Sequence, residues 1–187
     1  MRGTAPRVLP LVALTTAALA GALAACAPGG AAGAPPPGVP SPTATATHGL
    51  WPPDAEGIEQ PRPFEVRYGD RALLLHPFTF CADQGCADGF DEHPPAVGDV
   101  TELFVHVPLD GDVELTVSEV EGDEIEGDAV EGNEVRAADV ATEAEELGDG
   151  WWRVRLSGPA GEHLISLFAG GDGAGDMIAE VLWTGGG

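Results

Sequence analysis

Residues 151–183, WWRVRLSGPAGEHLISLFAGGDGAGDMIAEVLW, contain the pattern that decides the fold class of this chain. Apolar side chains recur at every second position in three runs, a period typical of a β-strand with one buried face. Turn-forming residues separate the runs, namely Pro159-Ala160-Gly161 and the Gly/Asp-rich stretch 170–176. The recurring positions are Trp152, Val154 and Leu156, then His163, Ile165 and Leu167, then Met177, Ala179, Val181 and Trp183. The stretch therefore predicts three short antiparallel strands.

Four earlier runs have strand character as well. Residues 64–68 and 113–117 alternate between apolar and polar side chains, whereas 72–76 and 103–107 are continuous apolar runs. A short continuous run fits a strand that is buried on both faces. About seven short strands, separated by turns and without a strong long helix, predict an all-β fold, an antiparallel sandwich.

The stretch 151–183 also resembles the last three strands of bacterial immunoglobulin-like modules. Those modules often carry a proline-alanine-glycine turn, one further residue, a tyrosine and then alternating apolar residues. His163 stands where they have their corner tyrosine, and the Cys-Trp-Cys spacing of antibody domains does not occur. The resemblance implies an immunoglobulin-like β-sandwich over residues 62–187. In it, His163 is expected to be a packed corner residue and not a catalytic base.

The first 26 residues have the order of an export signal. Arg2 and Arg7 precede an apolar run over 8–25 that ends in small residues. The final tetrapeptide, Leu23-Ala24-Ala25-Cys26, resembles the lipobox of bacterial lipoproteins. This resemblance implies that residues 1–25 are a lipoprotein signal peptide, that Cys26 carries a lipid, and that the protein is anchored to the outer face of a cell membrane. An ordinary secretory signal and an uncut membrane anchor remain alternatives.

Residues 26–61 are dominated by Pro, Ala, Gly and Thr and show no apolar period. Such composition predicts a disordered, partly polyproline tether between the lipid and the domain. Leu50 and Trp51 are its bulky apolar residues before Ile58, and His48 has no nearby ligand partner in the sequence.

Residues 119–149 form a predicted acidic insert in the domain. They include three copies of a five-residue unit, [Val/Ile]-Glu-Gly-[Asp/Asn]-x, at 120–134. Three short copies are too few for a solenoid, so we expect a mobile or hairpin-like insert. A short helix over 137–147, with Gly148 as its stop, is a further expectation.

The expected pairing of the cysteines depends on the assignment of the lipobox. If Cys26 is lipidated, Cys81 and Cys86 remain as a pair, and disulfides persist in exported proteins. We therefore expect a Cys81–Cys86 disulfide that shapes a loop over 81–100 and contributes little to the stability of the whole fold.

Charge is the strongest compositional signal. All 31 acidic residues follow Cys26, where they face six arginines and no lysine. Such a surface repels nucleic acid and anionic membranes and favours cations or basic partners. We expect no nucleic-acid partner, contact with the membrane only through the lipid, and a basic or cationic partner in the envelope.

Potential metal ligands gather in residues 76–93. The candidates are His76, Asp88, Asp91 and His93, with Cys81, Cys86 and Glu92 beside them. Cysteine and histidine can hold zinc or copper, but Cys-x4-Cys with one later His is not a specific signature. A disulfide loop with solvated acids is the preferred interpretation, so no cofactor is expected.

No serine lies in a Gly-x-Ser-x-Gly motif, and no other catalytic pattern occurs. The stretch 75–81, with Cys86-Ala87-Asp88-Gly89 behind it, resembles uncharacterised actinobacterial exported lipoproteins, which implies an envelope location and no known activity. We predict a lipid-anchored, exported, non-catalytic binding or envelope-structural module. The alternative is a metal-binding protein or metal-dependent enzyme that uses residues 76–93.

Overall fold

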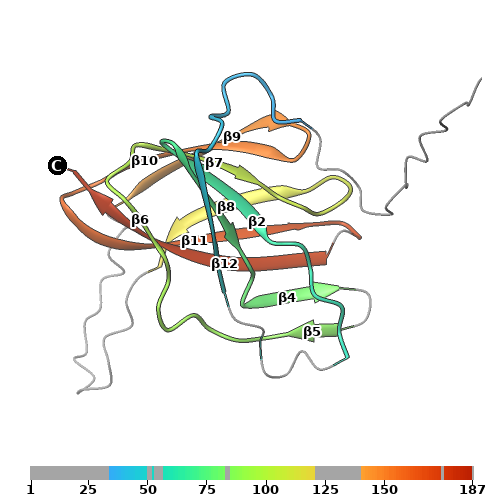
Figure 1. Ribbon diagram of the computed structural model, residues 1–187. Helices are drawn as coiled ribbons and strands as arrows, with labels where there is room; N and C mark the ends of the chain where they lie inside the picture. The colour runs from blue at the N-terminus through green and yellow to red at the C-terminus, as the bar shows by residue number, and fades with distance from the viewer. Residues whose placement is uncertain are drawn as a thin grey trace, which may run out of the picture. The chain divides into compact units, whose positions relative to one another are not determined.

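The computed structural model describes residues 34–49, 52, 57–82, 85–120, 140–173 and 175–186, all within the unit Ala32–Gly187 (Figure 1). These residues form twelve strands and no helix. The strands are β1 (Ala44–His48), β2 (Phe64–Tyr68), β3 (Arg71–Leu75), β4 (Thr79–Ala82), β5 (Gly85–Ala87), β6 (Ala96–Gly98), β7 (Glu102–His106), β8 (Glu114–Glu119), β9 (Ala141–Gly148), β10 (Trp151–Ser157), β11 (Gly161–Gly171) and β12 (Gly175–Gly185). The proposed lipobox and Cys26 lie outside the described residues, as do Leu50 and Trp51.

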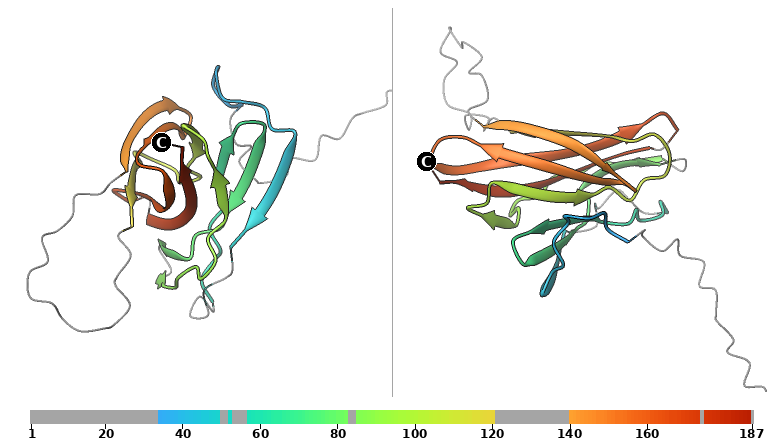
Figure 2. Two further views of the ribbon diagram at one scale, coloured as in Figure 1. Left: turned by 90° about the vertical axis from the view of Figure 1, so that its left-hand side faces the viewer. Right: turned by 90° about the horizontal axis from the view of Figure 1, so that it is seen from above.

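The strands form two sheets with a shared core (Figure 2). Sheet A has the order β1-β3-β2-β7-β10-β9, and sheet B has the order β5-β4-β12-β11-β8 with β6 added to β12. The pairings β1–β3 and β6–β12 are parallel and the others are antiparallel. The predicted all-β sandwich is confirmed. The prediction of about seven strands is too low, because β1, β4, β5, β6 and β9 join the seven runs that show a clear pattern.

The hairpin β11–β12 forms the centre of sheet B. Ile165, Leu167 and Ala169 on β11 are fully buried, as are Met177, Ala179 and Val181 on β12, in agreement with their period of two. Full burial of an aliphatic side chain such as leucine contributes about 1.5–3 kcal/mol. These two strands therefore supply much of the core that both sheets share.

A second, smaller apolar cluster lies on the outer face of sheet A. Trp151 and Phe104 are buried there, outside the main core. The Arg67 guanidinium lies 4.6 Å from the centre of the Trp151 ring, and its Nη1 donates to the Pro40 carbonyl at 2.9 Å. The chain around Pro40 is thus fastened over the cluster.

The predicted disordered tether over 26–61 is wrong for the stretch 44–48. These residues form β1, which pairs in parallel with β3 from Ala44↔Arg71 to His48↔Leu75. Alternating Ala and Thr give no apolar signal, but β-branched threonine suits an extended backbone. Backbone hydrogen bonds, and not buried apolar side chains, hold this segment on the domain.

The predicted helix over 137–147 is also wrong, and the acidic insert does not extend to 149. Residues 141–148 form β9, the edge strand of sheet A, which pairs with β10. Ion pairs cross this edge, since Arg155 contacts Glu143 at 3.1 Å and Arg153 contacts Glu145 at 3.2 Å. An exposed edge strand needs no apolar face, so its sequence lacks the strand period. The five-residue units from 121 onward lie outside the described residues.

The Cys81–Cys86 disulfide is confirmed. It joins directly opposed residues of β4 and β5, which form a hairpin at one edge of sheet B. The predicted loop over 81–100 therefore contains short strands at both ends, namely β5 and β6. The bridge closes a local hairpin, as its sequence spacing suggested.

Residues 121–139 should be replaceable without loss of the sandwich. The Glu119 carboxylate accepts from the Val140 N–H at 2.9 Å, so the two flanking positions lie beside each other and a short linker can join them. Loop-closure entropy depends only weakly on length. Replacing 121–139 with a short Gly/Ser linker should leave the thermal midpoint within about 4 °C of wild type, on the order of 1 kcal/mol. A Gly/Ser segment of the original length serves as control, and non-cooperative unfolding of both variants would contradict this expectation.

Candidate functional site

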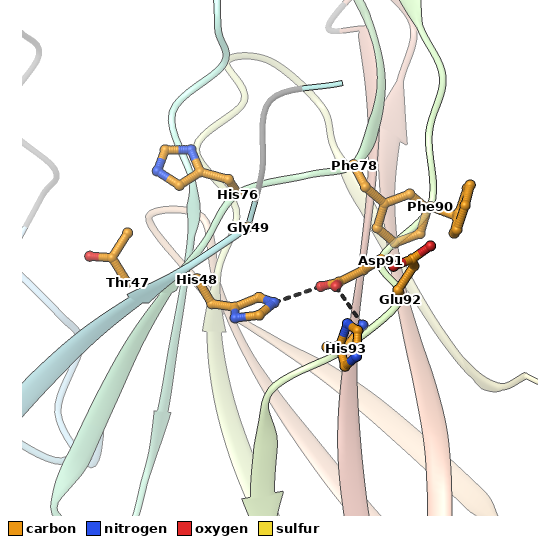
Figure 3. A pocket seen from close by; sticks show the side chains of 9 residues that line it. All are labelled: Thr47, His48, Gly49, His76, Phe78, Phe90, Asp91, Glu92 and His93. Atoms are coloured by element: carbon orange, nitrogen blue, oxygen red, sulfur yellow. Dashed lines mark hydrogen bonds and ion pairs between the residues drawn. The ribbon is translucent and has the colours of Figure 1, made fainter. Parts of the chain in front are cut away.

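A cavity of about 490 Å³ lies at the carboxyl ends of β1 and β3 (Figure 3). Three segments distant in sequence line it: 47–49, 76–78 and 90–93. The lining residues are Thr47, His48, Gly49, His76, Phe78, Phe90, Asp91, Glu92 and His93. We call this cavity the Asp91 pocket, because the carboxylate of Asp91 lies between the side chains that the other segments supply.

Parallel pairing of β1 with β3 brings the first two segments together. The His76 N–H donates to the His48 carbonyl at 2.8 Å, so both strands end at the same level. The chain then turns away at Gly49, whose φ is +116°. A Cβ on Gly49 would lie 2.8 Å from the His76 Cβ, so only glycine fits this position.

Thr79 fastens the start of the third segment. Its hydroxyl donates to Asp88 Oδ1 at 2.7 Å and accepts from the Gly89 N–H at 3.4 Å. Because Thr79 opens β4, these bonds hold the following residues, 90–93, against the end of sheet B and beside the carboxyl end of β1. The third segment is thus placed by β4, the first strand of the disulfide hairpin.

Asp91 is held from two sides. Its Oδ2 lies 2.7 Å from His48 Nε2, and its Oδ1 accepts from the His93 N–H at 3.0 Å. A carboxylate offers about four acceptor positions, so each oxygen can still accept from a ligand. The two bonds fix the orientation of the carboxylate, which lowers the cost of ordering it when a ligand binds.

A second carboxylate acts on Asp91 from sheet B. Burial raises the pKa of Glu180, on β12, and the negative charge of nearby Asp91 raises it further. Two carboxylates thus share a partly desolvated region, where their repulsion is stronger than in water. A cation near Asp91 would relieve this repulsion.

Glu180→Gln should therefore stabilise the protein near neutral pH. Between the ordinary carboxyl pKa of 4.5 and the raised pKa of Glu180, the folded protein holds a proton that the unfolded chain has released. The contribution of Glu180 to stability consequently falls as pH rises through this window. The variant should unfold at a higher temperature than wild type at about pH 7, and the difference should vanish near about pH 4. Glu114→Gln, at an exposed position of β8, is the control, and an unchanged difference at both pH values would contradict this account.

Phenyl rings complete the pocket. Phe90 is 77% exposed, which is unusual for a large apolar side chain, and Phe78 is partly buried. Figure 3 shows both rings on the same side of the pocket as Asp91 and Glu92. Carboxylates beside aromatic rings offer both charge and π-faces to a cation.

His76 lines the pocket but faces another neighbour. Gln60 Nε2 lies 3.3 Å from His76 Nδ1, and Figure 3 shows the ring directed away from Asp91. Burial lowers the pKa of His76, which favours the neutral imidazole. His76 therefore adds no positive charge that would oppose a cationic ligand.

The structure brings together three of the four metal-ligand candidates, His76, Asp91 and His93, in one pocket. Asp88 lies outside it and bonds to Thr79, while Cys81 and Cys86 are consumed by the disulfide. Among the described residues, no three or more His, Cys, Asp or Glu side chains converge in a group that could hold a metal ion.

His48 is the residue that sequence reasoning missed. The expectation that His48 has no ligand partner nearby is wrong for the folded chain, because His48 bonds to Asp91, which is 43 positions away in the sequence. The Pro/Ala/Thr-rich surroundings of His48 contain no signal for this contact, because it depends on the pairing of β1 with β3.

Two other histidines lie away from the pocket. His163 is half-buried, with Nδ1 2.7 Å from Glu119 Oε1 and Nε2 3.2 Å from the Pro159 carbonyl. It is a packed residue, as expected. His106 is buried on sheet A against the Trp151 ring at 5.1 Å, and desolvation lowers its pKa.

Comparison of the chain with family models, with curated proteins and with solved structures finds no match. In the described ranges, no helix has the length and apolar character needed to cross a membrane.

Proposed function

We propose that this protein is a lipid-anchored, exported, non-catalytic binding module, whose Asp91 pocket binds a cationic group of a partner in the cell envelope. The export signal and Cys26 support the location, and the Cys81–Cys86 disulfide fits an oxidising compartment. The domain is an immunoglobulin-like sandwich in this proposal. His163 supports that assignment, since it bonds to the Pro159 carbonyl much as a corner tyrosine bonds to the backbone a few residues upstream.

The composition of the pocket carries the proposal. Two of its nine lining residues are acidic, two are phenylalanines, and none is lysine or arginine. A hydrogen bond to a charged group contributes about 1.5–3 kcal/mol, and a cation–π contact about 0.5–2 kcal/mol. A single ammonium or guanidinium group should therefore bind with a Kd on the order of 1 mM. Such a weak site suits recognition of one side chain within a larger partner.

A metal-binding function is the second candidate, favoured by the contact of His48 with Asp91. Elemental analysis of the purified protein tests it directly. A stoichiometric transition metal that Asp91→Asn removes would favour this candidate over a site for organic cations.

NMR of the histidine rings tests the proposed function. The chain has five histidines, of which His48, His76 and His93 line the pocket, whereas His106 and His163 lie elsewhere and serve as internal controls. Nα-acetyl-lysine methylamide is titrated into the full-length chain in detergent, with the norleucine analogue as the neutral match. The lysine compound should shift the ring signals of His48 and His93 and leave His106 and His163 unchanged. Equal shifts from norleucine would overturn the proposal.

A further inference from the structure

Among the described residues, no further strand pairs with the outer side of β1, so β1 is an edge of sheet A. It is the last strand in the order of that sheet, and Figure 2 shows it at the rim, in blue to cyan. Its residues 44–47 are exposed. The opposite edge strand, β9, carries Glu143, Glu145 and Glu146, which discourage the addition of another strand. β1 carries only Ala and Thr before His48. Of the two edge strands of sheet A, β1 is therefore the one without charged side chains at its exposed positions.

The backbone groups on the outer side of β1 lead into the Asp91 pocket. The His48 carbonyl accepts from the His76 N–H, so the backbone groups of His48 point toward β3. Peptide groups alternate in direction along an extended strand. The N–H and C=O groups of Thr45 and Thr47 thus point away from β3, toward the open edge. Thr47 also lines the pocket, so the edge and the pocket are continuous.

We propose that an extended basic segment of a partner protein pairs with the open edge of β1 and places one lysine or arginine side chain in the Asp91 pocket. This inference rests on the proposed function and names the partner that the pocket serves. Strand addition supplies affinity through main-chain hydrogen bonds, and a side-chain pocket supplies specificity. The partner is basic because Asp91 and Glu92 line the pocket and because the chain has a formal net charge of −23.

A second copy of this chain fits the edge less well. Edge-to-edge pairing of two β1 strands would bring two strongly acidic proteins together. β1 also contains no lysine or arginine that could fill either pocket. Charge complementarity therefore favours a basic partner over self-association.

A capped peptide of alternating threonine and valine with one central lysine is the probe. Isothermal titration calorimetry measures its affinity for the full-length chain in detergent, beside capped lysine alone. The peptide should bind at least about tenfold more tightly than capped lysine, a gain of about 1.4 kcal/mol. N-methylation of the peptide backbone at the positions that face β1 should remove this gain. Norleucine in place of the lysine of the peptide should also remove it.

Thr45→Pro is the matching change in the protein. It removes an edge-facing N–H without touching the pairing with β3, a position where an edge strand tolerates proline. The variant should lose the tenfold gain for the peptide but bind capped lysine as wild type does, and Thr45→Val should behave as wild type. Equal binding of the N-methylated peptide, or of the peptide to folded Thr45→Pro, would overturn strand addition and leave the pocket function intact. Failure of capped lysine to bind wild type would instead overturn the proposed function.

Discussion

Trp183→Ala should lower the free energy of unfolding by about 3–5 kcal/mol, the range for removal of a buried aromatic side chain. Trp183 is 2% exposed and sits in the core shared by the two sheets. Its Nε1 donates to the Val100 carbonyl at 2.6 Å, which ties β12 to the loop after β6. The alanine variant loses the packing and leaves that carbonyl without its donor. Since a domain is stable by about 5–15 kcal/mol, urea unfolding should show a large shift of the midpoint.

Trp151 provides a matched control for the hydrogen bond. Both indoles are buried and each lies against a histidine ring, at 5.5 Å for His163 with Trp183 and at 5.1 Å for His106 with Trp151. The Trp151 Nε1, however, has no hydrogen-bond acceptor in the described part of the chain. Trp183→Phe should therefore cost about 1–2 kcal/mol more than Trp151→Phe. Equal costs would show that the bond to Val100 adds nothing.

Cys26→Ser should move the protein out of the membrane fraction. In the proposed function, the lipid on Cys26 is the anchor, and each buried CH₂ of an acyl chain contributes about 0.8 kcal/mol to membrane binding. Loss of the lipid should release the protein or leave its precursor uncut. Immunoblotting of membrane and soluble fractions from the producing cells measures both outcomes.

The disulfide cysteines supply the control for this experiment. The double variant Cys81→Ser/Cys86→Ser removes the bridge but leaves Cys26, so it should stay in the membrane fraction. Incorporation of labelled fatty acid should follow the same pattern. Continued labelling of Cys26→Ser would contradict the assignment of Cys26 as the lipid site.

The hairpin β11–β12 was predictable because one face of it is buried over most of its length. Ile165 to Ala169 and Met177 to Trp183 repeat every second residue, and turn residues mark both ends. β3 and β7 were found for a related reason, since buried strands show apolar runs. The core of the sandwich is thus visible in the sequence, because burial selects the residues that make it.

The edges of sheet A were not predictable in the same way. β1 and β9 are held by backbone pairing with β3 and β10, and few of their side chains are buried. Without a buried face, a strand has no period that distinguishes it from a tether or an acidic helix. The sequence therefore placed the first in a tether and the second in an insert.

Only part of the candidate site could be predicted from the sequence, for a similar reason. Asp91 and His93 are neighbours in sequence, so a local cluster drew attention to them, and His76 lies within the same stretch. His48 joins them only through the parallel pairing of β1 and β3, a contact that local sequence does not encode. Cys81 and Cys86 belonged to the same sequence cluster, but their disulfide removes them from any role as ligands.

A double-mutant cycle tests the central claim that the Asp91 pocket binds a cation. It combines Asp91→Asn with a change of ligand from capped lysine to capped norleucine, and calorimetry measures the four affinities. Asparagine keeps the shape of Asp91 and an acceptor for His48 but removes the charge. If the carboxylate pairs with the ammonium group, wild type should prefer lysine by at least about tenfold, or about 1.4 kcal/mol, and the variant should lose this preference. An undiminished preference for lysine in folded Asp91→Asn would contradict the claim.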